Sequence, residues 1–307
     1  MDFKLLVIGS GAATPTFARA CSSQLLNIYG MRILIDCGES TQDHLRHYHQ
    51  KIQSIKHVFL SHLHGDHFFG IPGLLSTMHL CGRTTPMTLY GPAGVREALE
   101  PLFRVSATNL RYPLEIVELD SDTPTVICRE KHFHVTAFPL HHSIPTYGYL
   151  FEEETPLLNM RPRVGEKYGL TSDQYAAIKN GSDLTLGDGT VIPNKELTMP
   201  PRKARGYAYC CDTAYEESII DVVRGVDLLC MESTFDSSNA DIAEQRCHCT
   251  AAQAATIASK AGVGRLLLTH FSARYSTVDT LLDEAKAIFP NTIAAEDGGE
   301  YEMNCEL

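Results

Sequence analysis

Short apolar runs separated by polar turns recur along the first half of the chain, and runs of this length favour strands over helices. The predicted strands cover residues 3–8, 23–28, 32–35, 58–60, 88–90, 116–119, 125–127, 132–139 and 147–151. Helical composition is confined to residues 41–50 and 95–103. The runs 116–119, 125–127 and 132–139 alternate between apolar and polar positions as paired antiparallel strands do.

The last third of the chain returns to regular patterning after a more polar middle segment. Strands are predicted at residues 206–210, 226–231 and 265–269, and helices at 214–223, 251–261 and 278–289. Thr250 and Gln253 have the spacing of a capping box, which would begin the helix at residue 251. Strands and helices interleave in both halves, and many strands look like hairpins. The pattern therefore predicts an α/β (α+β) fold of two mixed sheets covered by helices.

Residues 152–200 differ from both flanks because they are polar and rich in turn residues. We interpret the chain as a single domain, residues 1–307, with an arm inserted at residues 152–200. Residues 161–205 contain eight basic and five acidic residues, a net charge of +3 on a chain whose net charge is −11. A basic segment of this kind suits a phosphate-rich ligand, although a plain solvated loop has a similar composition.

Cysteine content and hydropathy narrow the class of protein. The ten cysteines do not follow the paired CxxC spacing of a structural zinc site, and the chain is too long for a disulfide scaffold. We expect reduced thiols in a cytoplasmic protein. No apolar run reaches the roughly 18 residues that a membrane helix needs, so we expect no membrane partner.

Residues 62–67 read HLHGDH and follow directly on the apolar run 58–60. They place three histidines and one aspartate within six positions: His62, His64, Asp66 and His67. Imidazole and carboxylate are the donors that zinc and similar divalent ions prefer. The segment therefore predicts a metal site.

Further histidines and aspartates follow apolar runs elsewhere in the chain. His142, with His141 beside it, follows residues 138–140, Asp212 follows 207–211, and His270 follows 266–269. Taken singly, Asp212 or His270 is better explained as a surface or capping residue, and an aspartate before threonine, as at Asp212, is often part of a turn. Because ligands at the ends of several strands can share one cleft, the recurrence favours a common metal site.

These motifs together resemble the metallo-β-lactamase superfamily, and within it the ribonuclease Z family, whose members trim tRNA precursors at the 3′ end. The resemblance rests on residues 59–67, 70–75, 142–149, 200–203, 209–213, 232–235, 248–255 and 269–275. It extends over most of the chain. It implies a four-layer αββα sandwich with the metal ligands at the rim between two sheets.

The resemblance also implies a cofactor of two Zn²⁺ ions per subunit, with Mn²⁺ or another divalent metal as the alternative. It assigns His62, His64 and His142 to one ion, Asp66, His67 and His270 to the other, and Asp212 to both. It selects His142 over His141 because one residue separates the family's ligand from the Ile-Pro stretch that follows. A metal-bound hydroxide would then attack the phosphodiester, leaving a 3′-hydroxyl on the tRNA and a 5′-phosphate on the trailer.

Three residues are implied in catalysis: Asp66, His248 and Glu232. His248 would protonate the leaving 3′-oxygen, and Glu232 would orient His248 or raise its pKa. The alternative is that Glu232 simply ends a strand. The residues implied in substrate binding are Arg19, Arg161, Arg163, Arg202, Lys203 and Arg274.

The partner implied is a tRNA precursor, bound by a homodimer in which the arm of one subunit serves the site of the other. The chain departs from the family pattern in two places. Its arm lacks the usual Gly-Pro-rich stretch, and its N-terminal loop keeps Arg19 but carries Phe17 and Ala20. The alternative function is a small-molecule phosphodiesterase or another hydrolase of the same fold. An intact ligand set disfavours a non-catalytic nucleic-acid-binding protein.

Overall fold

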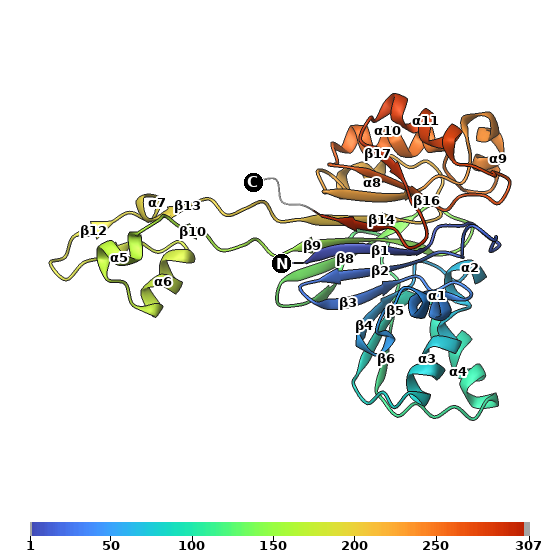
Figure 1. Cartoon of the computed structure of the whole chain (residues 1–307), viewed down its shortest axis with the longest axis horizontal. Coiled ribbons are helices and arrows are strands. Elements are labelled where there is room, and N and C mark those ends of the chain that lie inside the picture. Colours follow the sequence, from blue (N-terminus) through green and yellow to red (C-terminus); the bar gives the residue numbers. More distant parts are fainter. Residues whose placement is uncertain (1, 304–307) are drawn as a thin grey trace. The chain divides into compact units, whose positions relative to one another are not determined.

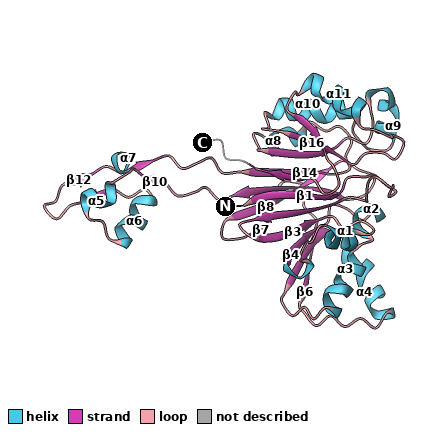
Figure 2. Cartoon of the chain, in the orientation of Figure 1, coloured by secondary structure: helices cyan, strands magenta, loops and turns pink. Residues whose placement is uncertain are grey.

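The computed structural model describes residues 2–303, which form two compact units: residues 2–152 with 206–303, and Glu153–Arg205. Within those residues the larger unit holds two seven-stranded sheets (Figures 1 and 2). The first has the order β18 (Glu300–Glu302), β1 (Phe3–Gly9), β2 (Ser23–Ile28), β3 (Met31–Ile35), β4 (Ile55–Phe59), β5 (Met87–Pro92) and β6 (Leu114–Leu119). The second has the order β17 (Thr292–Ala294), β16 (Leu266–Thr269), β15 (Leu228–Glu232), β14 (Gly206–Cys210), β9 (Thr146–Glu153), β8 (Phe133–Leu140) and β7 (Thr125–Arg129).

Aromatic side chains fill the space between the two sheets. The ring of Phe59 in β4 lies 5.2 Å from that of Tyr149 and 5.4 Å from that of Phe151, both in β9 and both in edge-on contact with it. All three side chains are buried in one apolar cluster. This packing holds the ends of strands from different sheets in fixed positions.

Helices cover the outer face of each sheet (Figure 1). Those on the first sheet are α1 (Thr41–His47), α3 (Ile71–Leu80) and α4 (Val95–Val105). In chain order, the short η1 (Ile52–Ser54) and α2 (Gly65–Phe68) come between α1 and α3. Those on the second sheet are α8 (Ser218–Val222), α10 (Ala251–Ala261) and α11 (Asp279–Ile288), with η2 (Ser237–Asn239) and α9 (Ala240–Gln245) before α10. The layers are therefore helix, sheet, sheet and helix, as predicted.

The predicted strands are confirmed, most of them with ends shifted by one to three residues. The helix 251–261 has the predicted bounds, and its capping box forms, with Thr250 accepting from the Gln253 backbone N–H. The expected pairing of 116–119 with 125–127 is wrong, because β6 lies parallel to β5 in the first sheet. Helix α4 makes that crossover, whereas β7 pairs with β8. Helix α3 was not predicted.

The smaller unit, Glu153–Arg205, has its own secondary structure. Its elements are β10 (Asn159–Met160), α5 (Val164–Tyr168), α6 (Ser172–Lys179), β11 (Leu184–Thr185), β12 (Val191–Ile192), α7 (Asn194–Leu197) and β13 (Thr198–Met199). Strand β10 pairs with β13, and β11 with β12. Val164, Ile178, Leu184 and Leu197 form a small buried cluster. None of the helices in the described part of the chain combines the length and apolarity that crossing a bilayer requires.

Candidate active site

The predicted ligands come together because each lies just beyond the end of a strand. The motif 62–67 follows β4 of the first sheet and leads into α2. His142, Asp212 and His270 follow β8, β14 and β16 of the second sheet. Strands β14, β15 and β16 run parallel, so their carboxyl ends meet at the same edge. The structure thus gathers all seven predicted ligands at one rim of the sandwich.

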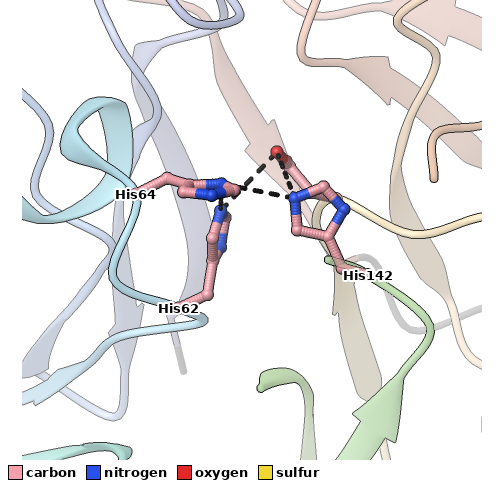
Figure 3. Close-up of side chains that lie close together, drawn as sticks. His62, His64 and His142 are labelled. Atoms are coloured by element: carbon pink, nitrogen blue, oxygen red, sulfur yellow. Dashed lines mark hydrogen bonds and ion pairs between the residues drawn. The ribbon is translucent and has the colours of Figure 1, made fainter. Parts of the chain in front are cut away.

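One group of ligand atoms comprises those of His62, His64, His142 and Asp212, all within 4.8 Å of one another. Figure 3 shows the three imidazoles turned toward a common point. His64 Nδ1 lies 3.1 Å from His62 Nε2 and 3.3 Å from His142 Nε2. Two nitrogens on a tetrahedral zinc ion lie about 3.3 Å apart, since each Zn–N bond is about 2.0–2.1 Å. The spacing of the three rings therefore suits zinc.

A second group comprises Asp66, His67 and His270. The Nε2 atoms of His67 and His270 lie 3.3 Å apart, and Asp66 Oδ2 lies 3.4 Å from that of His270. Asp212 stands between the two groups. Its Oδ1 lies 3.1 Å from His270 Nε2 and 3.3 Å from His67 Nε2, while its Oδ2 lies 3.6 Å from His62 Nε2. This is the position of a bridging carboxylate.

The state of these donors fits two divalent cations. Within residues 2–303, Asp212 Oδ1 is buried and has no hydrogen-bond partner. Burial lowers the pKa of His62 and of His142, so both rings are neutral and have a lone pair to give a metal. For His67, burial disfavours the charged form, yet the carboxylates of Asp212 and Asp36 raise its pKa well above the usual value. The buried carboxylates of Asp212 and Asp36 therefore favour bound positive charge at this site.

Asp36 is a site residue that the sequence reasoning missed. It is fully buried directly after β3, and its Oδ2 lies 2.7 Å from His67 Nδ1. The same carboxylate accepts from Ser61 N (2.7 Å) and from the Tyr209 hydroxyl (2.8 Å). These contacts fix the ring of His67 with Nε2 facing the candidate centre. An aspartate at a strand end was the signal, and it was the same signal that identified Asp212.

Backbone and hydroxyl groups hold two of the other rings. His142 Nδ1 lies 3.0 Å from the carbonyl oxygen of Cys247, and His270 Nδ1 lies 2.9 Å from Thr234 Oγ1. Gly38 lets the 62–67 loop approach, since a Cβ there would lie 2.2 Å from the carbonyl oxygen of Asp66. The ligand rings are therefore oriented before any metal binds.

His248 lies beside this centre and is paired with Glu232. Its Nδ1 is 2.8 Å from Glu232 Oε1, and its ring centroid is 5.2 Å from that of His142. Glu232 is fully buried and also accepts from Thr213 N (2.8 Å) and Thr234 Oγ1 (2.6 Å). Burial of His248 disfavours its charged form, but the Glu232 carboxylate raises its pKa to about 9. Glu232 is the last residue of strand β15 and its carboxylate contacts His248, so this geometry is compatible with both interpretations of Glu232.

The centre opens into a cavity of about 810 Å³. Besides the ligands and His248, its wall includes the loop residues 12–15, Phe69, Gln245 and Arg246. The backbone N–H of Ala13 donates to Asp66 Oδ2 at 2.7 Å, which ties that loop to the centre. Neither Gln245 nor Arg246 was singled out from the sequence, because no motif marks them.

The predicted basic residues are divided between the two units. Arg19 lies over the ring of Phe271, 5.2 Å from its centroid, and Arg274 lies 4.8 Å from the centroid of Phe235. Neither lines the cavity. The remaining four belong to the smaller unit: Arg161, Arg163, Arg202 and Lys203. Of these, Arg202 is bound to the carboxylate of Glu153.

Comparison with known proteins identifies the family to which the chain belongs. Residues 31–205 match the family model of the β-lactamase superfamily domain. Ribonuclease Z of Porphyromonas gingivalis (strain ATCC BAA-308 / W83) is 40% identical over 295 residues, which are 96% of this chain and 97% of that protein. Ribonuclease Z of Anoxybacillus flavithermus (strain DSM 21510 / WK1) is 40% identical over 309 residues, covering 98% of this chain and 97% of its own.

Among solved structures, the crystal structure of human tRNase Z, short form, superposes with a TM-score of 0.70 at 27% identity. The match covers 98% of this chain and 99% of the human chain. The sequence relatives and the superposed fold therefore extend along nearly the whole length, and the family model matches residues 31–205. The chain belongs to the ribonuclease Z family of the metallo-β-lactamase superfamily.

Proposed function

We propose that this chain is a zinc-dependent endoribonuclease that removes 3′ trailers from tRNA precursors. The products are a tRNA with a 3′-hydroxyl and a trailer with a 5′-phosphate. The single observation that carries the proposal is the placement of Asp212 between two groups of ligand atoms, with His248 in the same cavity. A phosphodiester placed there meets two cation sites and a proton donor together.

Two zinc ions, held by the seven ligands, would supply a water molecule of lowered pKa and positive charge against the phosphate oxygens. The chain itself supplies the fixed geometry. Asp36 and Thr234 hold His67 and His270 by their Nδ1 atoms, which leaves both Nε2 atoms facing the centre. Holding ligands in place before the reaction lowers the reorganisation that the transition state requires.

His248 supplies the proton for the leaving 3′-oxygen. Glu232 binds its Nδ1, which leaves Nε2 free to face the substrate. With a pKa raised to about 9, His248 carries that proton at neutral pH. Asp66 acts as a metal ligand in this scheme. Its carboxylate accepts a hydrogen bond from Ala13 N and lies beside His270 Nε2, in the second group of ligand atoms.

The smaller unit is the proposed tRNA-binding arm of a single catalytic domain. Its exposed cations, among them Arg161, Arg163 and Lys203, suit a phosphate backbone. We further propose a homodimer in which each arm serves the site of the other subunit. Light scattering tests the dimer by its molar mass. Since tRNA precursors mature in the cytoplasm, we place the enzyme there.

The deciding experiment is cleavage of an end-labelled tRNA precursor with a 3′ trailer by wild type and by His248→Ala. His141→Ala is the matched control, since His141 adjoins a ligand but is exposed. We expect a cut after the discriminator base by wild type and His141→Ala, and loss of cleavage in His248→Ala with zinc content unchanged. No cleavage by a fully metallated wild type would rule the proposal out.

A small-molecule phosphodiesterase is the second candidate, because every predicted ligand lies in the larger unit. Replacing residues 158–199 by a short Gly-Ser linker separates the two functions. We expect the shortened protein to keep hydrolysis of bis(p-nitrophenyl) phosphate and to lose affinity for the precursor. Equal precursor cleavage by both proteins would remove the arm from the proposed function.

A further inference from the structure

Arg246 is a basic residue in the wall of the active-site cavity. Among the residues described, it is the one arginine or lysine that lines this cavity, and it lies two positions before His248. The same wall contains three carboxylates, those of Glu39, Asp66 and Asp212. The guanidinium of Arg246 adds a permanent positive charge to that wall, beside the protonated His248, for an incoming polyanion.

The guanidinium of Arg246 is free to bind a ligand. In residues 2–303 it makes no hydrogen bond, ion pair or ring contact, and the side chain is exposed. Other arginines near the cavity are engaged: Arg274 donates to Asn239 Oδ1 at 2.7 Å, and Arg19 stacks on Phe271. A planar fork of donors with no protein partner matches the oxygens of a phosphate.

The end of helix α9 fixes where Arg246 lies. Cys247 has a φ of +54°, the left-handed conformation that usually requires glycine, and it ends the helix. His248 N donates to Ala243 O at 2.8 Å, and the Cys247 carbonyl oxygen lies 3.0 Å from His142 Nδ1. One tight turn therefore ties Arg246 to a predicted metal ligand and to the proposed proton donor.

We propose that Arg246 binds a backbone phosphate of the RNA next to the phosphodiester that is cut. The inference rests on the proposed function and deepens it by naming a residue that positions the single strand in the cavity. An arginine that forks onto a neighbouring phosphate places the scissile bond against His248 without taking part in its cleavage.

Binding of an uncleavable precursor, in which a methylene group replaces the bridging 3′-oxygen at the cut site, tests the proposal on the zinc-loaded protein. We expect Arg246→Ala to weaken binding about tenfold, as for loss of a charged hydrogen bond. The slope of log Kd against log salt should fall by about 0.7, the value for one phosphate of a single strand. Arg246→Lys should keep the slope and recover part of the affinity.

Arg104→Ala is the matched control, because Arg104 is an exposed arginine in the last turn of helix α4 and does not line the cavity. Removing it takes away the same charge from a helix end. We expect its affinity and salt slope to equal those of wild type. If Arg104→Ala lost as much affinity as Arg246→Ala, the total charge of the protein rather than the position of Arg246 would determine binding, and the proposal would be overturned.

Single methylphosphonate substitutions locate the contact. Neutralising the phosphate on either side of the cut should weaken wild type, and at one of these positions it should weaken Arg246→Ala no further. Equal sensitivity of both proteins at both positions would overturn the inference. If wild type bound and cut no precursor at all, the proposed function would fail, whereas an unaffected Arg246→Ala beside an active wild type refutes the inference alone.

Discussion

The carboxylate of Asp36 lies 2.7 Å from Nδ1 of His67, and both side chains are fully buried. The contact joins the end of strand β3 to the candidate metal centre. It fixes the ring of His67, a predicted ligand that the motif 62–67 supplies but does not orient.

Replacing Asp36 by asparagine should weaken metal binding about 10- to 100-fold, the usual effect of losing such an orienting partner. Zinc retained against a chelator series measures it. Asp43→Asn is the control, because Asp43 is exposed on helix α1. Equal retention by both variants would contradict an orienting role for Asp36.

Glu232→Gln should lower kcat for precursor cleavage about 10²-fold, since the amide no longer offers His248 Nδ1 a charged acceptor. KM and zinc content should change little. Glu244→Gln serves as the control, because Glu244 is exposed on helix α9. A drop in zinc content that accounts for the lost activity would instead make Glu232 part of the metal site.

The buried carboxylate of Glu153 holds two guanidiniums of the smaller unit. It binds Arg202, and it accepts from Arg205 Nε at 3.0 Å and Nη2 at 2.5 Å. Glu153→Gln leaves buried positive charge uncompensated, so we expect a loss of about 3 kcal/mol in the stability of that unit. Hydrogen exchange of helix α6 reports it.

Glu302→Gln provides the comparison, because the Glu302–Lys4 pair is exposed and lies in the other unit. Screening by water makes such a pair weak, so this variant should exchange as wild type does. Similar exchange in both variants would show that Glu153 does not hold the smaller unit together.

Two capping boxes offer a matched pair of stability tests. Thr250→Ala removes the cap of α10, which should cost about 1 kcal/mol and lower the melting temperature of the larger unit by about 2–4 °C. Thr171→Ala removes the same kind of cap from α6 in the smaller unit, and it should leave the melting temperature of the larger unit unchanged. Calorimetry separates them. Equal shifts in one transition would indicate that the two units unfold together.

Local patterning predicted much of the fold. Strands such as 206–210 and the helix 251–261 were predicted with their observed bounds, because short buried apolar runs and a capping box are signals within a few residues. Strand β6 was assigned to the wrong neighbour. Pairing depends on the crossover through α4, which joins residues far apart in the chain.

Local patterning did not predict the buried core of the smaller unit. Its buried cluster of Val164, Ile178, Leu184 and Leu197 has one apolar side chain from each of several short elements. No window of the sequence contains enough of them to give a periodic signal. The segment therefore looked like a polar loop, although it buries a core of its own.

The candidate metal-binding donors can be identified from the sequence alone, because the HLHGDH motif places four of them within six positions and each remaining one follows an apolar strand. Tertiary structure decided how those donors are aimed and what surrounds them. Asp36 reaches His67 from 31 positions away, and Arg246 borders the cavity because of one left-handed residue at a helix end. Such contacts arise when distant strand ends and turns pack together, and no local pattern encodes them.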